Sequence, residues 1–208
     1  MNQAWQLLAE TAGKNKPEWK KSILDHARIV HDLSLRLADL FSEDRQVDVE
    51  TVQLGAVLHD VGRSRADRVV EHGIKSGEML REEGFPEGAA RIAETHVGVG
   101  ITPEQAASLG LPEGNYIPET LEERIVCYAD NLLNYLVDEG RHELVDRRAV
   151  VKRFSLELGE EYGKRAEDFM TGLEMELGPE RFVRFRRYVE EVNERLQTGE
   201  RGEESDQD

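Results

Sequence analysis

The sequence predicts an all-α protein, and three observations support this class. Apolar residues recur at intervals of three and four along most of the chain, which is the spacing of one helix face. No segment shows a convincing alternation of apolar and polar residues, as a half-buried strand would. Glycine and proline divide the chain into segments of helical length. The 208 residues suffice for one large domain with its own core.

The first half contains four predicted helices and one short one. A long helix starts near Pro17, which suits a first turn, and carries its apolar stripe to Phe41. The segment 47–62 forms the second helix and ends at a glycine. Helices over 72–84 and 86–96 follow, the first of them ended by Gly84. A short helix near 103–110 lies within the loop 98–118.

The second half begins with a helix over 121–140. Thr120 and Glu123 have the spacing of a capping box at its start, and Gly140 ends it. Three more helices are expected at 145–158, 161–177 and 180–196. We therefore expect a main domain over 18–140, a helical extension over 141–198 packed on the same domain, and an acidic disordered tail over 199–208. The extension also offers a surface for a homodimer.

Charge and composition exclude several function classes. The formal net charge is −16, which disfavours contacts with the phosphates of nucleic acids and with anionic lipid surfaces. No segment has the ~20 consecutive apolar residues of a membrane span, and the N-terminus does not resemble a signal peptide. Cys127 is the single cysteine, so no intrachain disulfide can form. We expect a cytoplasmic protein that binds neither nucleic acid nor membrane.

Two buried carboxylates indicate a metal site. His59 and Asp60 directly follow an apolar run, and Asp130 lies among apolar residues of its helix. A buried carboxylate is costly unless it is paired or binds a metal. Two such groups in one chain suggest that each is a ligand of the same cation.

Three more histidines complete the candidate set. His31 lies beside the apolar face of the first helix, while His72 begins one helix and His96 ends another. Ends of helices converge on one point more easily than their middles do. Four imidazoles and two carboxylates could hold two metals, and an imidazole-rich set favours transition metals over Mg²⁺. His26 is interpreted as structural or exposed, and His142 as solvated.

These residues, in this order, resemble the HD superfamily of metal-dependent phosphohydrolases. The similarity includes the sequence around each ligand and covers about residues 22–137. Its segments are VHDLSLRLADL, LGAVLHDVGR, EHGIKSGEMLREEGFP, IAETHVGVG and LEERIVCYADNLL. The layout is similar to the binuclear subgroup, in particular to HD-type symmetric diadenosine tetraphosphate hydrolases. Those enzymes have Thr-Gly-Arg after the later histidine, whereas this chain has Val97-Gly98-Val99.

The resemblance implies an HD helical bundle with a binuclear centre. One metal would be bound by His31, His59, Asp60 and Asp130, and the second by His72 and His96, with Asp60 bridging. Two divalent ions are expected, with Fe, Mn, Co or Ni preferred over Zn and Mg. A metal-bridging hydroxide would attack a phosphoester or phosphoanhydride of a nucleotide or another small phosphorylated molecule.

Asp60, Arg63 and Lys75 are the expected catalytic residues. Arg63 directly follows the HD helix and is the first candidate to hold a phosphate, and Lys75 is the second. The loop 98–118 leaves directly from His96, so we expect it near the mouth of the site.

Three alternatives remain open at this point. A minority of HD proteins use a similar ligand set in a mixed-valent di-iron centre that activates oxygen on an organic substrate. The chain could also be a non-catalytic module that binds a nucleotide or a partner. Finally, His72 and His96 could contact the substrate of a mononuclear site.

Overall fold

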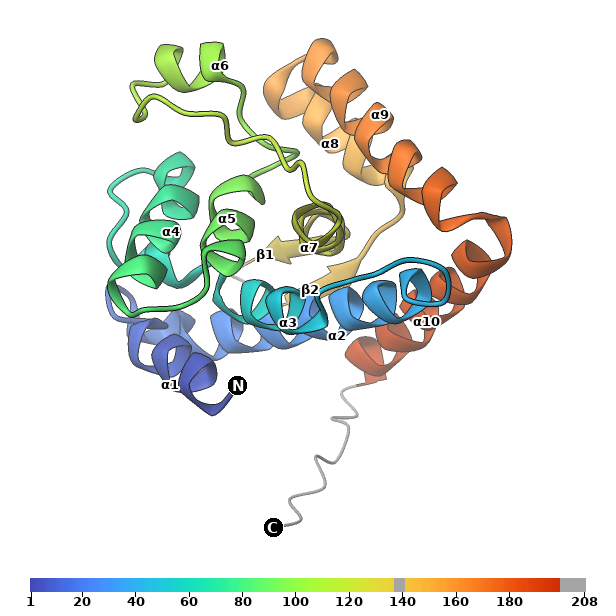
Figure 1. Cartoon of the computed structure of the whole chain (residues 1–208), viewed down its shortest axis with the longest axis horizontal. Helices are drawn as coiled ribbons and strands as arrows, with labels where there is room; N and C mark the ends of the chain where they lie inside the picture. Colours follow the sequence, from blue (N-terminus) through green and yellow to red (C-terminus); the bar gives the residue numbers. More distant parts are fainter. Residues whose placement is uncertain (137–140, 199–208) are drawn as a thin grey trace.

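The computed structural model describes residues 1–136 and 141–198, and within them the fold is almost entirely helical (Figure 1). The helices are α1 (Asn2–Thr11), α2 (Lys20–Phe41), α3 (Val49–Leu58), α4 (His72–Glu82), α5 (Glu87–Thr95), α6 (Pro103–Ser108), α7 (Leu121–Asn131), α8 (Arg147–Leu158), α9 (Glu160–Leu177) and α10 (Pro179–Thr198). Three short 3₁₀ helices are η1 (Pro17–Trp19), η2 (Val61–Ser64) and η3 (Val69–Glu71). The strands are β1 (Leu133–Leu136) and β2 (Arg141–Leu144).

The all-α prediction is confirmed, and several helices begin at a residue whose side chain caps them. The Thr120 side chain accepts a hydrogen bond from the backbone N–H of Glu123 at 3.2 Å. Thr102 accepts one from Gln105 in the same way at the start of α6. Each of these bonds satisfies one of the first backbone donors of a helix, which have no partner inside the helix.

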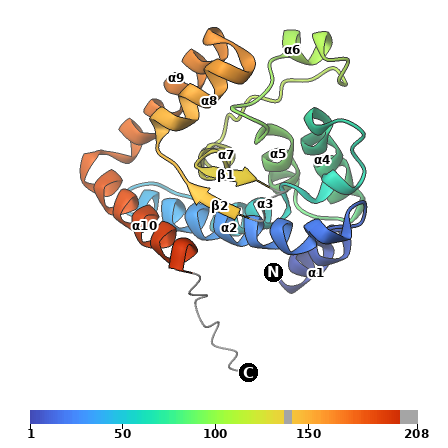
Figure 2. The same cartoon turned by 180° about the vertical axis from the view of Figure 1, so that it is seen from behind.

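The prediction of a helix over 121–140 is wrong beyond Asn131. Residues Leu133–Leu136 form β1 instead, which pairs antiparallel with β2 (Figure 2). Leu133 lies opposite Leu144, and both side chains are buried in the core. A short apolar run fits a buried strand as well as a helix, so periodicity alone could not separate the two. Gly140, the expected end of the helix, lies outside the described residues, as does the tail 199–208.

The N-terminal helix α1 lies outside the predicted helices. Only Ala4, Leu8 and Thr11 of its ten residues are buried. This narrow stripe packs against α3 and η2. Two apolar residues one turn apart in a polar segment give too weak a periodic signal to predict the helix.

Two large apolar clusters that each include residues of α2, and a third smaller one, build the core of the described residues. In the first, α2 and α7 pack with the hairpin and with α8, α9 and α10. In the second, residues of α1 and the start of α2 pack with α3, α4 and α5. In Figure 1, α7 is seen end-on at the centre, with α5 on one side and α8 and α9 on the other. The ends of several helices therefore meet near the middle of the molecule.

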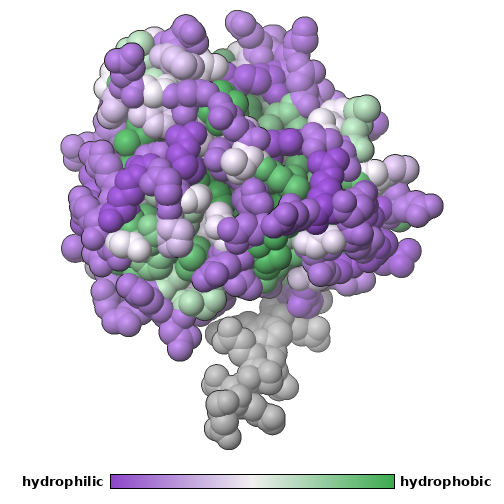
Figure 3. Space-filling model, viewed as in Figure 1, coloured by the Kyte–Doolittle hydropathy of each residue, from purple (hydrophilic) through white to green (hydrophobic). Residues whose placement is uncertain are grey.

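Polar side chains cover most of the surface. Figure 3 shows hydrophilic residues over much of one face, with small apolar areas between them. None of the described helices is both long enough and apolar enough to cross a membrane.

Candidate metal centre

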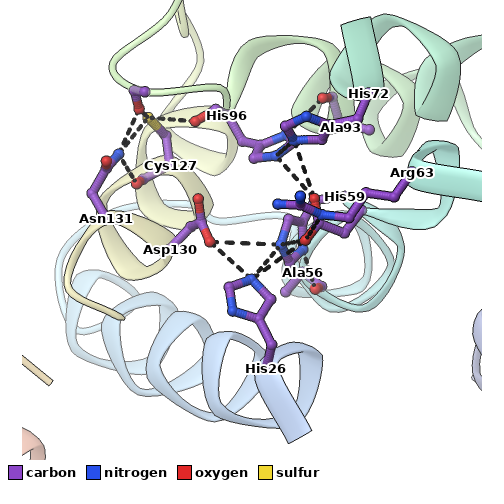
Figure 4. A network of polar contacts seen from close by, with 12 residues as sticks. His26, Ala56, His59, Arg63, His72, Ala93, His96, Cys127, Asp130 and Asn131 are labelled. Atoms are coloured by element: carbon purple, nitrogen blue, oxygen red, sulfur yellow. Dashed lines mark hydrogen bonds and ion pairs between the residues drawn. The ribbon is translucent and has the colours of Figure 1, made fainter. Parts of the chain in front are cut away.

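Four histidines and two aspartates meet where five helices approach one another (Figure 4). His26 comes from α2, His59 and Asp60 follow α3, and His72 begins α4. His96 follows α5, and Asp130 lies at the end of α7. We call these six residues, namely His26, His59, Asp60, His72, His96 and Asp130, the histidine cluster. Five of the six predicted ligands thus lie close together, at or near the ends of helices that converge.

Three of the histidines are oriented by the same local contact. The Nδ1 of His59 lies 2.8 Å from the carbonyl oxygen of Ala56, and that of His96 lies 2.7 Å from that of Ala93. His72 makes the equivalent contact with the carbonyl of Val69. A carbonyl can only accept, so Nδ1 carries the proton and Nε2 keeps its lone pair. All three rings therefore present a bare Nε2 to the cluster.

Asp60 divides the imidazoles into two groups. Its Oδ2 lies 3.6 Å from Nε2 of His26 and 3.6 Å from Nε2 of His59. Its Oδ1 lies 3.2 Å from Nε2 of His72 and 3.5 Å from Nε2 of His96. Asp130 belongs to the first group, with its Oδ1 3.0 Å from Nε2 of His26. One carboxylate thus faces a different pair of histidines with each oxygen.

The charges of the cluster offset the cost of burial. Burial by itself would raise the pKa of Asp60, but the charge of Arg63 and the neighbouring imidazoles of His59, His72 and His96 hold it well below its usual range. The pKa of Asp130 is also lowered, because the effect of His26 and His59 exceeds that of burial. Both carboxylates are therefore anionic at neutral pH.

The imidazoles respond mainly to their burial. Burial lowers the pKa of His59 to about 4, and it lowers that of His72 together with the nearby charge of Arg63. For His96 the two aspartates outweigh burial and raise the pKa. His59 and His72 are thus neutral at pH 7, the state in which an imidazole binds a metal.

The donor set fits divalent metal ions. Nε2 of His72 and Nε2 of His96 lie 2.9 Å apart, and those of His26 and His59 lie 3.0 Å apart. The bare nitrogens of His72 and His96 repel at this distance unless a cation lies between them. Neighbouring ligands that are each about 2.1 Å from one octahedral ion would be ~3.0 Å apart. The groups His26–His59–Asp130 and His59–Asp60–His96 each bring their ligand atoms within 4.8 Å of one another.

The structure places His26, and not the predicted His31, in the histidine cluster. His31 lies against Trp5, with ring centroids 5.8 Å apart, and its Nδ1 is 3.5 Å from Asp32. Five residues correspond to about 140° around a helix, so both histidines cannot face the same point. His26 is buried, three residues after Ile23 and four before Val30, within the apolar face of α2. That spacing is the signal in the sequence that could have identified it.

Arg63 and Lys75 have different surroundings. Arg63 lies in η2, and its Nε is 2.7 Å from Oδ2 of Asp60, beside the cluster. Lys75 pairs instead with Glu78, its Nζ 2.8 Å from the carboxylate, and this contact raises its pKa. Gly62 allows η2 to approach α4 closely, since a Cβ there would collide with the backbone of His72 and Ser76. The structure thus brings Arg63, and not Lys75, to the histidine cluster.

His142 is half-buried rather than solvated. Its Nε2 lies 3.2 Å from the carbonyl of Ser22, and its ring is 6.4 Å from that of His26. Burial lowers its pKa. His142, which belongs to β2, therefore packs next to His26.

The segment after His96 is held by the C-terminal helices. Gly98 has a φ of +61° and lies directly against Tyr162 of α9. The Tyr162 hydroxyl accepts a bond from the N–H of Val99 at 3.1 Å, and Arg165 donates to the carbonyl of Gly100 at 2.6 Å. On the other side, Cys127 donates to the carbonyl of Gly98 at 3.3 Å. Side chains of α7 and α9 thus fix the segment that leaves His96.

Replacement of this tyrosine should destabilise the protein. In Tyr162→Phe the N–H of Val99 loses its acceptor in a partly buried site, which should lower the free energy of unfolding by about 1–3 kcal/mol. Urea denaturation would measure this loss. As a control, Tyr188→Phe removes a hydroxyl that contacts the side chain of Arg195, and we expect a change within about 0.5 kcal/mol. Equal effects of the two changes would contradict the role given to Tyr162.

Comparison with known proteins identifies the matching family. The family model of the HD domain matches residues 23–135. An uncharacterized protein of Methanocaldococcus jannaschii is 44% identical over 143 residues, which cover 68% of this chain and 80% of the relative.

Two further relatives are named tRNA (cytidine(56)-2'-O)-methyltransferases. Those of Picrophilus torridus and Thermoplasma volcanium are 36% and 35% identical, and the matches cover 73% and 64% of this chain. The chain spans only 46% and 41% of their lengths. The activity in their names therefore does not follow for the shared segment.

Among solved structures, the HD domain of the phosphodiesterase PgpH of L. monocytogenes has a similar fold. Its TM-score is 0.54 at 15% identity, with 91% of this chain and 96% of that chain covered. The same domain in complex with cyclic-di-AMP gives 0.53 at 15% identity, with 97% and 99% covered. At this identity the similarity shows the fold alone.

Proposed function

Because the chain belongs to the HD-domain family, we propose that it is a metal-dependent phosphohydrolase that cleaves a phosphoester or phosphoanhydride of a small phosphorylated molecule. The observation that carries this proposal is the arrangement around Asp60. Its two oxygens face two separate pairs of histidines.

The proposed centre holds two ions. His26, His59 and Asp130 with Oδ2 of Asp60 would bind the first, and His72 and His96 with Oδ1 of Asp60 the second. When bound, such ions supply a water of lowered pKa and neutralise charge on the oxygens of a phosphate. The imidazole-rich set favours Fe, Mn, Co or Ni over Mg²⁺.

Arg63 has the position and the chemistry to bind the substrate's phosphate. Its guanidinium lies beside Asp60, and its side chain is 32% exposed, so it can be reached from solvent. A guanidinium binds phosphate oxygens through two parallel hydrogen bonds and stays charged at every relevant pH. Since the chain as a whole is acidic, Arg63 supplies positive charge where an anionic substrate needs it.

The test is hydrolysis by the full chain, purified without chelator or histidine tag. The chain, loaded in turn with Mn²⁺, Fe²⁺, Co²⁺ and Ni²⁺, should release phosphate from members of a panel of nucleotides and other small phosphate esters. EDTA should abolish the activity, and added metal should restore it. As a control, Lys75→Ala should retain the activity, because Lys75 pairs with Glu78 away from the cluster.

Two outcomes would overturn the proposal. A chain that binds metal but releases no phosphate from any compound of the panel is not a phosphohydrolase of this kind. Oxygen uptake by the iron-loaded chain, without phosphate release, would assign it to the oxygenases with a similar ligand set.

A further inference from the structure

A cavity of about 300 Å³ opens beside the histidine cluster, and its outer wall comes from the N-terminal segment. Asp60, Arg63 and His72 form its inner end, while residues 8–19 of α1 and η1 form the opposite wall. No residue of the loop 98–118 lines it, although Leu109 of that loop accepts a bond from Arg68 at the rim. The loop 98–118 therefore reaches the rim of this cavity without lining it.

The N-terminal wall lies ahead of the segment that defines the family match. Residues 1–22 precede the segment that the HD family model matches. Leu8 and Ala12 anchor the wall in the second apolar cluster. Asn15 ties it to η2, because its Nδ2 donates to the carbonyl of Ser64 at 3.1 Å. The wall is thus fixed next to the short helix that carries Arg63.

The charge of the cavity is opposite to that of the chain. Lys14, Lys16, Arg63 and Arg68 line it, against only Asp60 and Asp67, whereas the whole chain has a net charge of −16. In the described part of the chain, no carboxylate lies within ion-pair distance of Lys14 or Lys16, and both are exposed. Such a local excess of positive charge attracts an anion.

The same cavity has an apolar and aromatic side. Leu8, Ile23 and Val61 line it, and Trp19 stands half-buried at its edge. The Nζ of Lys16 lies 3.5 Å from the centroid of the Trp19 ring. An indole face next to a cation suits a flat aromatic group that carries a negative charge close by, since bases stack on such rings.

The volume limits the size of the ligand. Sites for small molecules span about 300–1,000 Å³, so this cavity lies at the lower end of the range. A cavity of this size suits a ligand of about one nucleotide unit.

We propose that this cavity binds the organic part of the substrate and that the substrate is a nucleoside monophosphate. The phosphate lies toward Arg63 and the histidine cluster, and the base lies against Trp19 with Lys14 and Lys16 at the rim. This inference rests on the proposed phosphohydrolase function, but its test does not need turnover.

The chain offers a direct reporter of the cavity. It contains two tryptophans, so Trp5→Phe leaves Trp19 as the single one. In this variant, titration with AMP should quench the tryptophan fluorescence, while inorganic phosphate and cyclic-di-AMP should not. In Lys14→Ala/Lys16→Ala the dissociation constant for AMP should rise about 5- to 10-fold. The matched control Lys20→Ala/Lys21→Ala changes two exposed lysines outside the cavity and should leave it unchanged.

A second variant distinguishes a loss of AMP binding from misfolding. Trp19→Leu keeps an apolar side chain and should weaken AMP binding, measured by calorimetry, about 10-fold or more, with an unchanged circular dichroism spectrum. Quenching by AMP without phosphate release from AMP or from any other compound of the panel would support the cavity and overturn the hydrolase function. Phosphate release from AMP that is insensitive to Trp19→Leu and to the lysine changes would support the function and overturn the cavity.

Discussion

Asp60→Asn should abolish hydrolysis and lower the metal content. The amide keeps the shape of the carboxylate but has only one oxygen and no charge, so it cannot face both pairs of histidines with an anionic oxygen. Even changes to the partners of metal ligands cost 10- to 100-fold in affinity or activity, so loss of this ligand should lower kcat/KM by at least ~100-fold. Elemental analysis should find about two metal equivalents in the unchanged chain and fewer in the variant.

The matched control for this change is Asp32→Asn. Asp32 is 54% exposed at its side chain and contacts only the neighbouring His31 among the described residues. Its replacement should leave metal content and rate unchanged. An Asp60→Asn protein with its full metal complement and rate would remove the basis of the proposed centre.

His26→Ala and His31→Ala should have opposite outcomes, although the two residues lie on one helix. His26 places Nε2 3.0 Å from Nε2 of His59 and 3.0 Å from Oδ1 of Asp130. Its removal should lower the metal content by about one equivalent and the rate by at least ~100-fold. His31 should be dispensable for both, because its ring packs on Trp5.

The two variants also differ in stability. Loss of the edge contact between His31 and Trp5 should lower the free energy of unfolding by about 1 kcal/mol, which chemical denaturation can measure. Metal loss in His31→Ala with full metal in His26→Ala would restore the ligand set that the sequence resemblance implies. Metal analysis of both proteins, prepared side by side, decides between the two histidines.

The choice between these histidines shows where the sequence falls short. Both lie near Val30, and either could face inward as long as the neighbours of α2 are unknown. Only the packing of α2 against α3 and α7 decides which side of the helix meets His59 and Asp130. By contrast, Asp60 and Asp130 stood out in the sequence because an aspartate among apolar residues requires a partner.

The fold, too, has parts that the sequence can predict and parts that depend on packing. Long periodic segments such as α2 and α9 are predictable because a wide apolar stripe repeats over several turns. The run Leu132–Leu133 at the start of β1 contains too few residues to carry a period, and α1 buries too few. The cavity wall built by α1 and η1 therefore could not be foreseen, although it borders the histidine cluster.

The contact between Tyr162 and the segment after His96 has a consequence for cooperativity. Phe154, Met170 and Phe185 of the C-terminal helices share one apolar cluster with Val30 and Ile125, so the core extends beyond the family segment 23–135. A fragment cut at that boundary would expose the apolar faces of α2 and α7 to water and lose the support of the His96 segment. We therefore expect the smallest cooperatively folding unit to include α8, α9 and α10, and the ligand geometry to depend on helices that contribute no ligand.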